Sequence, residues 1–152
     1  MNLTQLLEQR KAEILSQATD VLARTHLTHY EEGDAAQIHG RLQTLYDLMA
    51  QSIKDRDLTL IVHYAETLAQ ERFAAGFDLY EVQTAFNVLE AAIWKQIIQD
   101  CPPPELAEAL GLASTVHGAA KDALARQYVS LASQSRPASL NLLALFKGTD
   151  GF

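Results

Sequence analysis

Apolar residues recur at every third or fourth position along almost the whole chain, and no segment alternates regularly between apolar and polar residues. A spacing of three and four places such residues on one face of an α-helix, whereas a half-buried strand needs a spacing of two. The clearest stripe lies in the middle of the chain and consists of Leu79, Val82, Phe86, Leu89, Ile93 and Ile97. The pattern predicts an all-α protein.

Residues that begin and end helices divide the chain into five segments. Gly76 suits a helix end because glycine accepts the left-handed backbone, and Pro104 suits a first turn because no helical partner awaits its missing N–H there. The expected segments run from about Leu3 to about His26, from Asp34 to about Lys54, from Asp57 to Gly76, from Asp78 to about Asp100, and from Pro104 to about Ser133. Long helices with short connections indicate a bundle of five to six helices, with globin-like packing as one arrangement.

The length of 152 residues is that of one domain. We expect residues 1–133 to form the helical domain, and residues 134–152 to form a linker followed by a short docking helix or tail. The apolar residues of the tail are Leu140, Leu142, Leu143, Leu145 and Phe146. Two interpretations stay open: the tail folds back onto the bundle, or a partner protein holds it through residues such as Leu142 and Phe146.

The charge pattern argues against two classes of partner. The net charge is −7, and the twelve lysines and arginines are scattered without a basic stripe. Nucleic acids and anionic membranes both need clustered cations, so we expect neither. No apolar run approaches the ~18 residues of a membrane span, and residues 1–5 lack the pattern of a signal peptide, so we expect a cytoplasmic protein. The single cysteine, Cys101, excludes an intramolecular disulfide.

The motifs of common catalytic and metal sites are absent from the chain. It has no Glu-x-x-His for a di-iron bundle, no His-Glu-x-x-His and no Cys-x-x-Cys. It also has no phosphate-binding loop, dinucleotide fingerprint or nucleophile elbow. We therefore expect no catalytic residue, no metal and no cofactor, and we predict that the protein is not an enzyme.

The histidines leave one alternative open. His26 and His29 are three residues apart, and since a metal would need further ligands from elsewhere, a polar helix end is the simpler interpretation. His63 and His117 lie in mid-helix beside apolar positions, where a histidine is more commonly a hydrogen-bonded core or boundary residue than a haem ligand. The alternative function is a small-ligand or haem-binding globin-like sensor with a pocket near His63, His117 or Trp94.

The segment after Asp78 also has a semi-polar helix face. Its members are Gln83, Asn87, Glu90 and Trp94. Tryptophan is favoured at interfaces, so this face is either a surface for a partner or ligand, or a boundary of the bundle with a half-buried tryptophan. In the last segment, many alanines together with Gly111 and Gly118 predict a close approach to a neighbouring helix.

The stretch from Tyr64 to Trp94 carries a family resemblance. It resembles the N-terminal domain of the RsbT co-antagonist proteins of the RsbRD type, the sensory module of bacterial stressosomes. The residues that carry the resemblance are Arg72, Gly76, Phe77, Asp78, Leu79, Glu81, Val82, Asn87, Leu89, Glu90 and Trp94. Asp78 and Glu81 in this set also have the spacing of a capping box, which normally begins with Ser or Thr. The resemblance extends to about Ser133.

The resemblance implies a helical input domain related to non-haem globin-like sensors. Such domains usually precede a STAS output domain that kinases phosphorylate and that binds partner regulators. No segment of this sequence could form the strands of a STAS domain, and the family has no catalytic residues to carry over. We therefore expect a non-enzymatic signalling domain of the stress response that forms a homodimer and binds a protein partner, such as a STAS-domain protein or a switch kinase.

Overall fold

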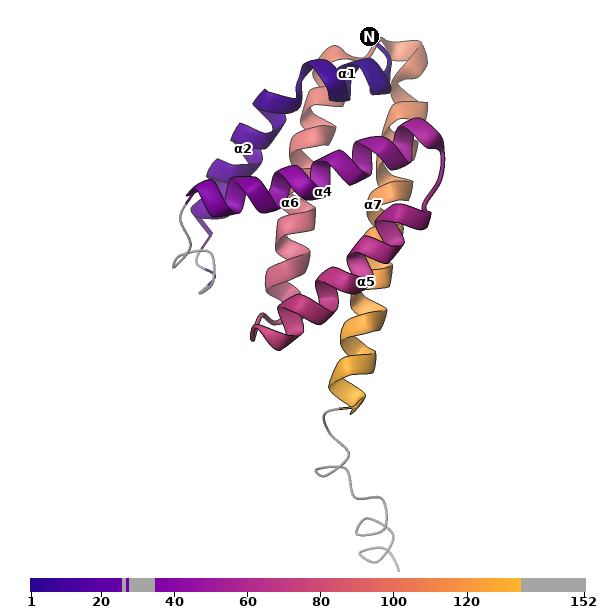
Figure 1. Ribbon diagram of the computed structural model, residues 1–152. Coiled ribbons are helices and arrows are strands. Elements are labelled where there is room, and N and C mark those ends of the chain that lie inside the picture. Colours follow the sequence, from indigo (N-terminus) through magenta and orange to yellow (C-terminus); the bar gives the residue numbers. More distant parts are fainter. Residues whose placement is uncertain (26, 28–34, 135–152) are drawn as a thin grey trace, which may run out of the picture.

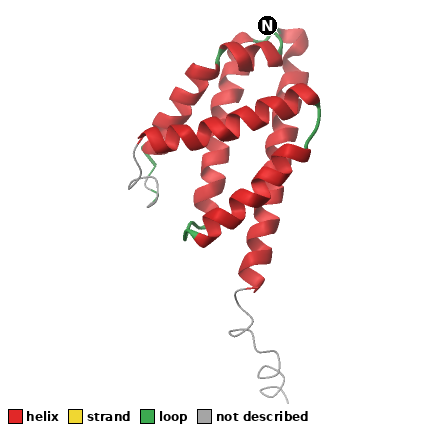
Figure 2. Ribbon diagram, in the orientation of Figure 1, coloured by secondary structure: helices red, strands yellow, loops and turns green. Residues whose placement is uncertain are grey.

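Six α-helices make up most of the computed structural model, which describes residues 1–25, 27 and 35–134. The helices are α1 (Leu3–Gln9), α2 (Lys11–Ala23), α4 (Ala35–Asp55), α5 (Thr59–Ala74), α6 (Leu79–Asp100) and α7 (Pro103–Gln134). The described residues contain no strand, and short turns join most of the helices (Figure 2). The prediction of an all-α bundle of five to six helices is therefore confirmed.

The helices form two layers around one core (Figure 1). α4 and α5 lie in front of α6 and α7, and α7 packs against both α5 and α6. α2 joins the layers because it packs against α4 and α6, while α1 closes one end. The largest fully buried side chains are Tyr46, Phe86, Leu6, Ile14, Leu15, Leu22, Ile38, Leu42, Met49, Ile61, Leu89 and Ile93.

The prediction of one continuous first helix was wrong, because the chain breaks at Arg10 between α1 and α2. Two long-range contacts hold this break. The Tyr46 hydroxyl donates to the Leu7 carbonyl at 2.6 Å, and in a continuous helix this carbonyl would instead accept the N–H of Lys11. Arg10 Nε donates to Asp100 Oδ2 at 2.8 Å. The apolar residues on either side of the break keep a helical spacing, so the stripe could not reveal it.

The other helix boundaries differ little from the expected ones. α2 ends at Ala23, a few residues before the expected end at about His26. α7 begins at Pro103 and not at Pro104, and both prolines suit the first turn of a helix because no backbone N–H is needed there. The N-cap of α5 is Leu58 and not the expected Asp57, which lies one residue earlier and accepts the Thr59 N–H at 2.9 Å through its carboxylate. His26, His29, Asp34 and the tail residues Leu142 and Phe146 lie outside the described residues.

The close approach of α7 to its neighbours rests on alanines and not on glycines. Its buried face includes Ala109, Ala113, Ala120 and Ala123. Gly111 and Gly118 are exposed, and a Cβ added at either would meet no atom within 4 Å. The part of the prediction that gave these two glycines a packing role was therefore wrong.

Candidate functional site

The turn between α5 and α6 ends one helix with a glycine. Gly76 has a φ of 87°, in the left-handed region, and its N–H donates to the Phe73 carbonyl at 3.1 Å. The next N–H, that of Phe77, donates to the Arg72 carbonyl at 3.0 Å. These two bonds form a Schellman motif, which satisfies the last carbonyls of α5 and requires the left-handed residue at Gly76.

The same turn begins the next helix with a capping box. The Asp78 carboxylate accepts the Glu81 N–H at 2.8 Å, and Glu81 Oε1 accepts the Asp78 N–H at 3.3 Å. Asp78 replaces the usual serine or threonine, as the spacing predicted. The motif residues of this turn are therefore explained by backbone hydrogen bonds.

Phe77 connects the turn to the other helices through its ring and its carbonyl. Its buried ring lies under two guanidinium groups, with Arg41 Cζ of α4 at 5.5 Å and Arg72 Cζ of α5 at 5.4 Å from the ring centroid. Its carbonyl accepts the Tyr128 hydroxyl of α7 at 3.1 Å, and the ring of Tyr128 packs edge-on against Phe73. A single turn thus connects α4, α5, α6 and α7.

The predicted polar face of α6 is partly tied to α7. Lys121 Nζ donates to Asn87 Oδ1 and to Glu90 Oε1, both at 3.1 Å. The other Glu90 oxygen lies 3.8 Å from His117 Nδ1. Gln83 is half-buried. Trp94 is 38% exposed and is the large apolar side chain of this face that contacts solvent.

His117 is the one fully buried histidine in the part of the chain that the structure describes. Its Nδ1 lies 2.8 Å from the Ala113 carbonyl oxygen, so Nδ1 carries a proton and donates to it. Burial lowers the pKa of His117 to about 4, and the nearby Glu90 carboxylate only partly offsets this effect. Nε2 is buried and has no hydrogen-bond partner. His63 is exposed on α5.

One side of α6 carries a regular row of residues, which are exposed except for the half-buried Thr84, and we name this row the α6 seam. Its members are Tyr80, Thr84, Asn87, Ala91, Trp94 and Ile98. The spacing is four, three, four, three, four, the repeat of a coiled-coil contact line. Tyr80 is 69% exposed and Ile98 is 60% exposed. Four members of the seam, from Tyr80 to Ala91, also line an open groove of about 630 Å³ between α2 and α6.

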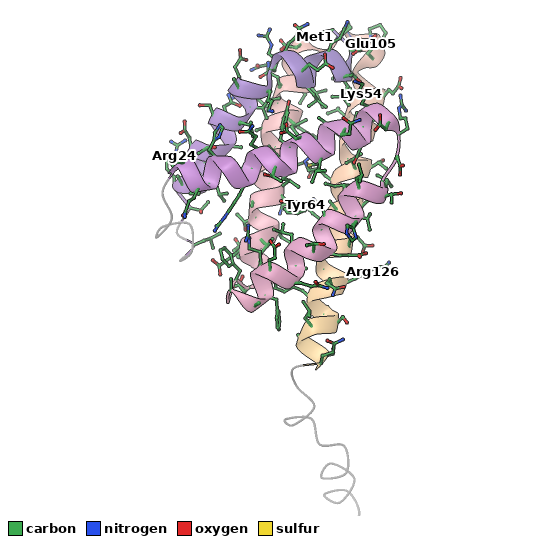
Figure 3. The ribbon with its side chains drawn as sticks, in the orientation of Figure 1. Met1, Arg24, Lys54, Tyr64, Glu105 and Arg126 are labelled. Atoms are coloured by element: carbon green, nitrogen blue, oxygen red, sulfur yellow. The ribbon has the colours of Figure 1, made fainter. Side chains whose placement is uncertain are left out.

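A second open pocket, which we name the arginine pocket, lies between α4 and α5 and measures about 440 Å³. Arg41, Arg72 and Tyr64 line it, together with Gln37, Gly40, Thr44, Leu68 and Glu71. Figure 3 labels Tyr64 on α5. The same two arginines and Tyr64 also border a chamber of about 30 Å³ whose other walls are mostly apolar, including Ile38 and Phe86.

Metal binding finds no support among the described side chains, since they contain no group of three or more histidines, cysteines or carboxylates that could hold an ion. In the same part of the chain, no helix has both the length and the apolar character that crossing a membrane requires. Among the described residues, His63 and His117 line neither the groove between α2 and α6, nor the arginine pocket, nor the chamber beside it.

The fold is an all-α bundle, and its most regular surface feature is the α6 seam, next to the turn at Phe77 that contacts four helices. Comparison with protein families then gives the family: the RsbT co-antagonist protein rsbRD N-terminal domain matches residues 6–138. The chain belongs to this family, as the resemblance predicted, and the family is a sensor-type N-terminal domain in the stressosome context. Neither the curated proteins nor the solved structures contain a match to the chain.

Sequence reasoning missed the long-range partners of the predicted residues. Lys121 binds the polar face of α6, Arg41 covers Phe77, and Tyr128 holds the turn carbonyl. Each of these contacts joins residues more than thirty positions apart, and helical periodicity carries no information at that distance. For Lys121, Arg41 and Tyr128, the sequence itself shows only a charge or a hydroxyl group that needs a partner.

Proposed function

We propose that this domain is a non-catalytic sensor that acts through protein–protein contacts, and that two copies pair through the α6 seam. The observation that carries the pairing is the heptad spacing of exposed residues on a helix whose opposite face is already buried. A coiled-coil line of this kind packs against a helix with the same spacing. A second copy of the chain supplies that spacing by definition.

A two-fold axis across α6 makes the seam complementary to itself. In an antiparallel pairing, the exposed Tyr80 of one copy meets Ile98 of the other, and Asn87 meets Ala91 near the axis. The aromatic and aliphatic ends therefore lie together, and the polar and small residues share the centre. Each copy thereby covers Tyr80, Trp94 and Ile98, three of the large apolar side chains that it exposes alone.

The test compares an Ile98→Glu variant with a Leu60→Glu control by light scattering after size exclusion. Both side chains are exposed and apolar, but Leu60 lies on α5, away from the seam. We expect the unmodified chain and Leu60→Glu to have the mass of two chains, and Ile98→Glu to have the mass of one at an unchanged melting temperature. A wild-type monomer, or a dimeric Ile98→Glu, contradicts the proposal.

The predictions of a partner other than a second copy and of the cellular location rest on the family match alone. A STAS-domain protein or a switch kinase remains the predicted partner, with the tail residues Leu142 and Phe146 as its candidate contacts, and a cytoplasmic location remains a prediction. Capture of a switch kinase by the full chain, compared with a chain lacking residues 134–152, tests the role of the tail. Haem binding is the weaker alternative, because His63 is exposed and His117 lines neither the groove between α2 and α6 nor the chamber beside the arginine pocket.

A further inference from the structure

The centre of the α6 seam carries an amide, Asn87, whose N–H donors have no acceptor among the described residues. Its oxygen is occupied, because Oδ1 accepts Lys121 Nζ at 3.1 Å. The neighbouring polar residue of the seam differs, since Thr84 Oγ1 donates to the Tyr80 carbonyl of its own helix at 2.7 Å. Near the middle of the seam, the two N–H groups of Asn87 are therefore the donors that still need a partner.

Lys121 determines which way this amide is turned. An ammonium group only donates, so the oxygen of Asn87 faces Lys121 on α7 and the nitrogen lies on the other side of the planar amide. Lys121 is itself held in place, because it is half-buried and Nζ also donates to Glu90 Oε1 at 3.1 Å. The same bond occupies the carboxylate of Glu90, one helical turn from Asn87. The N–H groups of Asn87 thus point away from α7.

Two seams with heptad spacing can pair in more than one register. In the antiparallel pairing proposed above, Asn87 lies opposite Ala91 of the second copy. A slip by one heptad places Asn87 opposite Ile98 and Ala91 opposite Trp94. Both registers cover the exposed side chains of Trp94 and Ile98, so apolar contact alone discriminates weakly between them. A slip in the other direction leaves Trp94 and Ile98 beyond the paired row.

The amide of Asn87 discriminates between the first two registers. Opposite Ile98, its N–H groups would be covered by apolar side chains and would lose water without gaining an acceptor. A buried donor without a partner weakens association by about tenfold or more. Opposite Ala91, the small side chain leaves space for water beside the amide, so the donors keep a partner. A single asparagine on a coiled-coil contact line selects the register through this kind of difference.

We propose that Asn87 selects the register in which two copies pair along the α6 seam, and that Lys121 is the residue that positions its amide. This inference rests on the proposed pairing and deepens it by naming the residues that determine its specificity. Without Lys121, the N–H groups of Asn87 can turn to the freed carboxylate of Glu90, since residues three apart are neighbours on a helix. The amide is then satisfied within its own chain, and the slipped register leaves no donor unpaired.

The test measures the register by disulfide formation between two chains that carry different tags. Lys95 is exposed on α6 beside the seam, so a cysteine at this position keeps the large apolar seam residues in place. Thr84→Cys in one chain and Lys95→Cys in the other lie side by side in the proposed register. Ala91→Cys and Lys95→Cys lie side by side in the slipped register. The native Cys101 is buried, and a chain without an added cysteine is the control.

Three further variants assign the roles of the two residues. In the parent chain, we expect the cross-link of the proposed register in at least about tenfold excess over the slipped one. Asn87→Leu and Lys121→Met should each bring the two cross-links to comparable yields while the mass stays that of two chains. Lys121→Arg, which keeps a charged donor, should retain the excess. A purely structural role of Lys121 would lower the melting temperature of Lys121→Met without changing the ratio of the cross-links.

The register role and the pairing can fail separately. Comparable cross-links in the parent chain, or an unchanged excess in Asn87→Leu, overturn the role of Asn87, while a mass of two chains still supports the seam. A parent chain with the mass of two chains that forms neither cross-link contradicts pairing along the seam. A mass of one chain at every concentration contradicts the pairing itself, and the register role falls with it.

Discussion

Individual residues in this domain divide into those whose roles are decided within a few positions and those whose roles are decided by other helices. Gly76, Asp78 and Glu81 belong to the first group, and the sequence predicted their helix-ending and capping roles because each partner is at most three residues away. Glu90 and His117 belong to the second group. Their contact depends on the register of α6 against α7, which no local pattern encodes.

His117 should make the stability of the domain fall in acid. Its pKa drops from 6.5 to about 4 on folding, because the buried ring resists protonation. Between these values the unfolded chain binds more protons than the folded chain, so the free energy of unfolding rises with pH across this window. We expect a loss of up to about 3 kcal/mol as the pH falls from 7 to 4, measured by urea unfolding.

The control for this effect is His117→Leu. The substitution removes the titrating ring and the buried Nε2 that has no partner, and leucine has a strong helix preference. We expect the free energy of unfolding at pH 7 to change by less than about 1.5 kcal/mol, and the acid-side slope to become shallower. An unchanged slope in this variant would show that other groups dominate the acid response.

At the scale of helices, the spacing of apolar residues predicted which helix faces are buried, but not which side-chain contacts join one helix to another. The apolar stripe of α6 is buried at Val82, Phe86, Leu89, Ile93 and Ile97 as expected. The break between α1 and α2 was not predictable, because its causes are the Tyr46 hydroxyl and the Asp100 carboxylate, which come from distant helices. The two glycines of α7 were misinterpreted for the same reason, since composition cannot show which side of a helix a small residue occupies.

Those two glycines give a prediction for α7. Gly111→Ala and Gly118→Ala should each raise the free energy of unfolding by up to about 1 kcal/mol, because alanine restricts the unfolded chain and meets no atom in the folded one. Gly76→Ala, at a φ of 87°, should instead lower it by about 1 kcal/mol or more. Thermal unfolding of the three variants checks both signs. Destabilisation by either substitution in α7 would mean that α7 has a further contact there.

At the scale of the whole molecule, the arginine pocket and the α6 seam lie on different layers and are connected through one turn. The arginine pocket belongs to α4 and α5, and the seam belongs to α6 beside α2. Phe77 and Asp78 stand between them, since Phe77 contacts both arginines and Asp78 caps α6. A change in the position of Arg72 therefore has a direct physical route to the first turn of the helix that carries the seam.

The central claim is that two copies meet at the α6 seam, and the single tryptophan of the chain lies within it. Trp94 is 38% exposed in one chain and would be covered in the pair. The most direct measurement follows Trp94 emission and sedimentation mass together during dilution. We expect the emission to move to longer wavelength as the mass falls from two chains to one. An emission that stays constant while the mass halves, or a mass of one chain at every concentration, would contradict it.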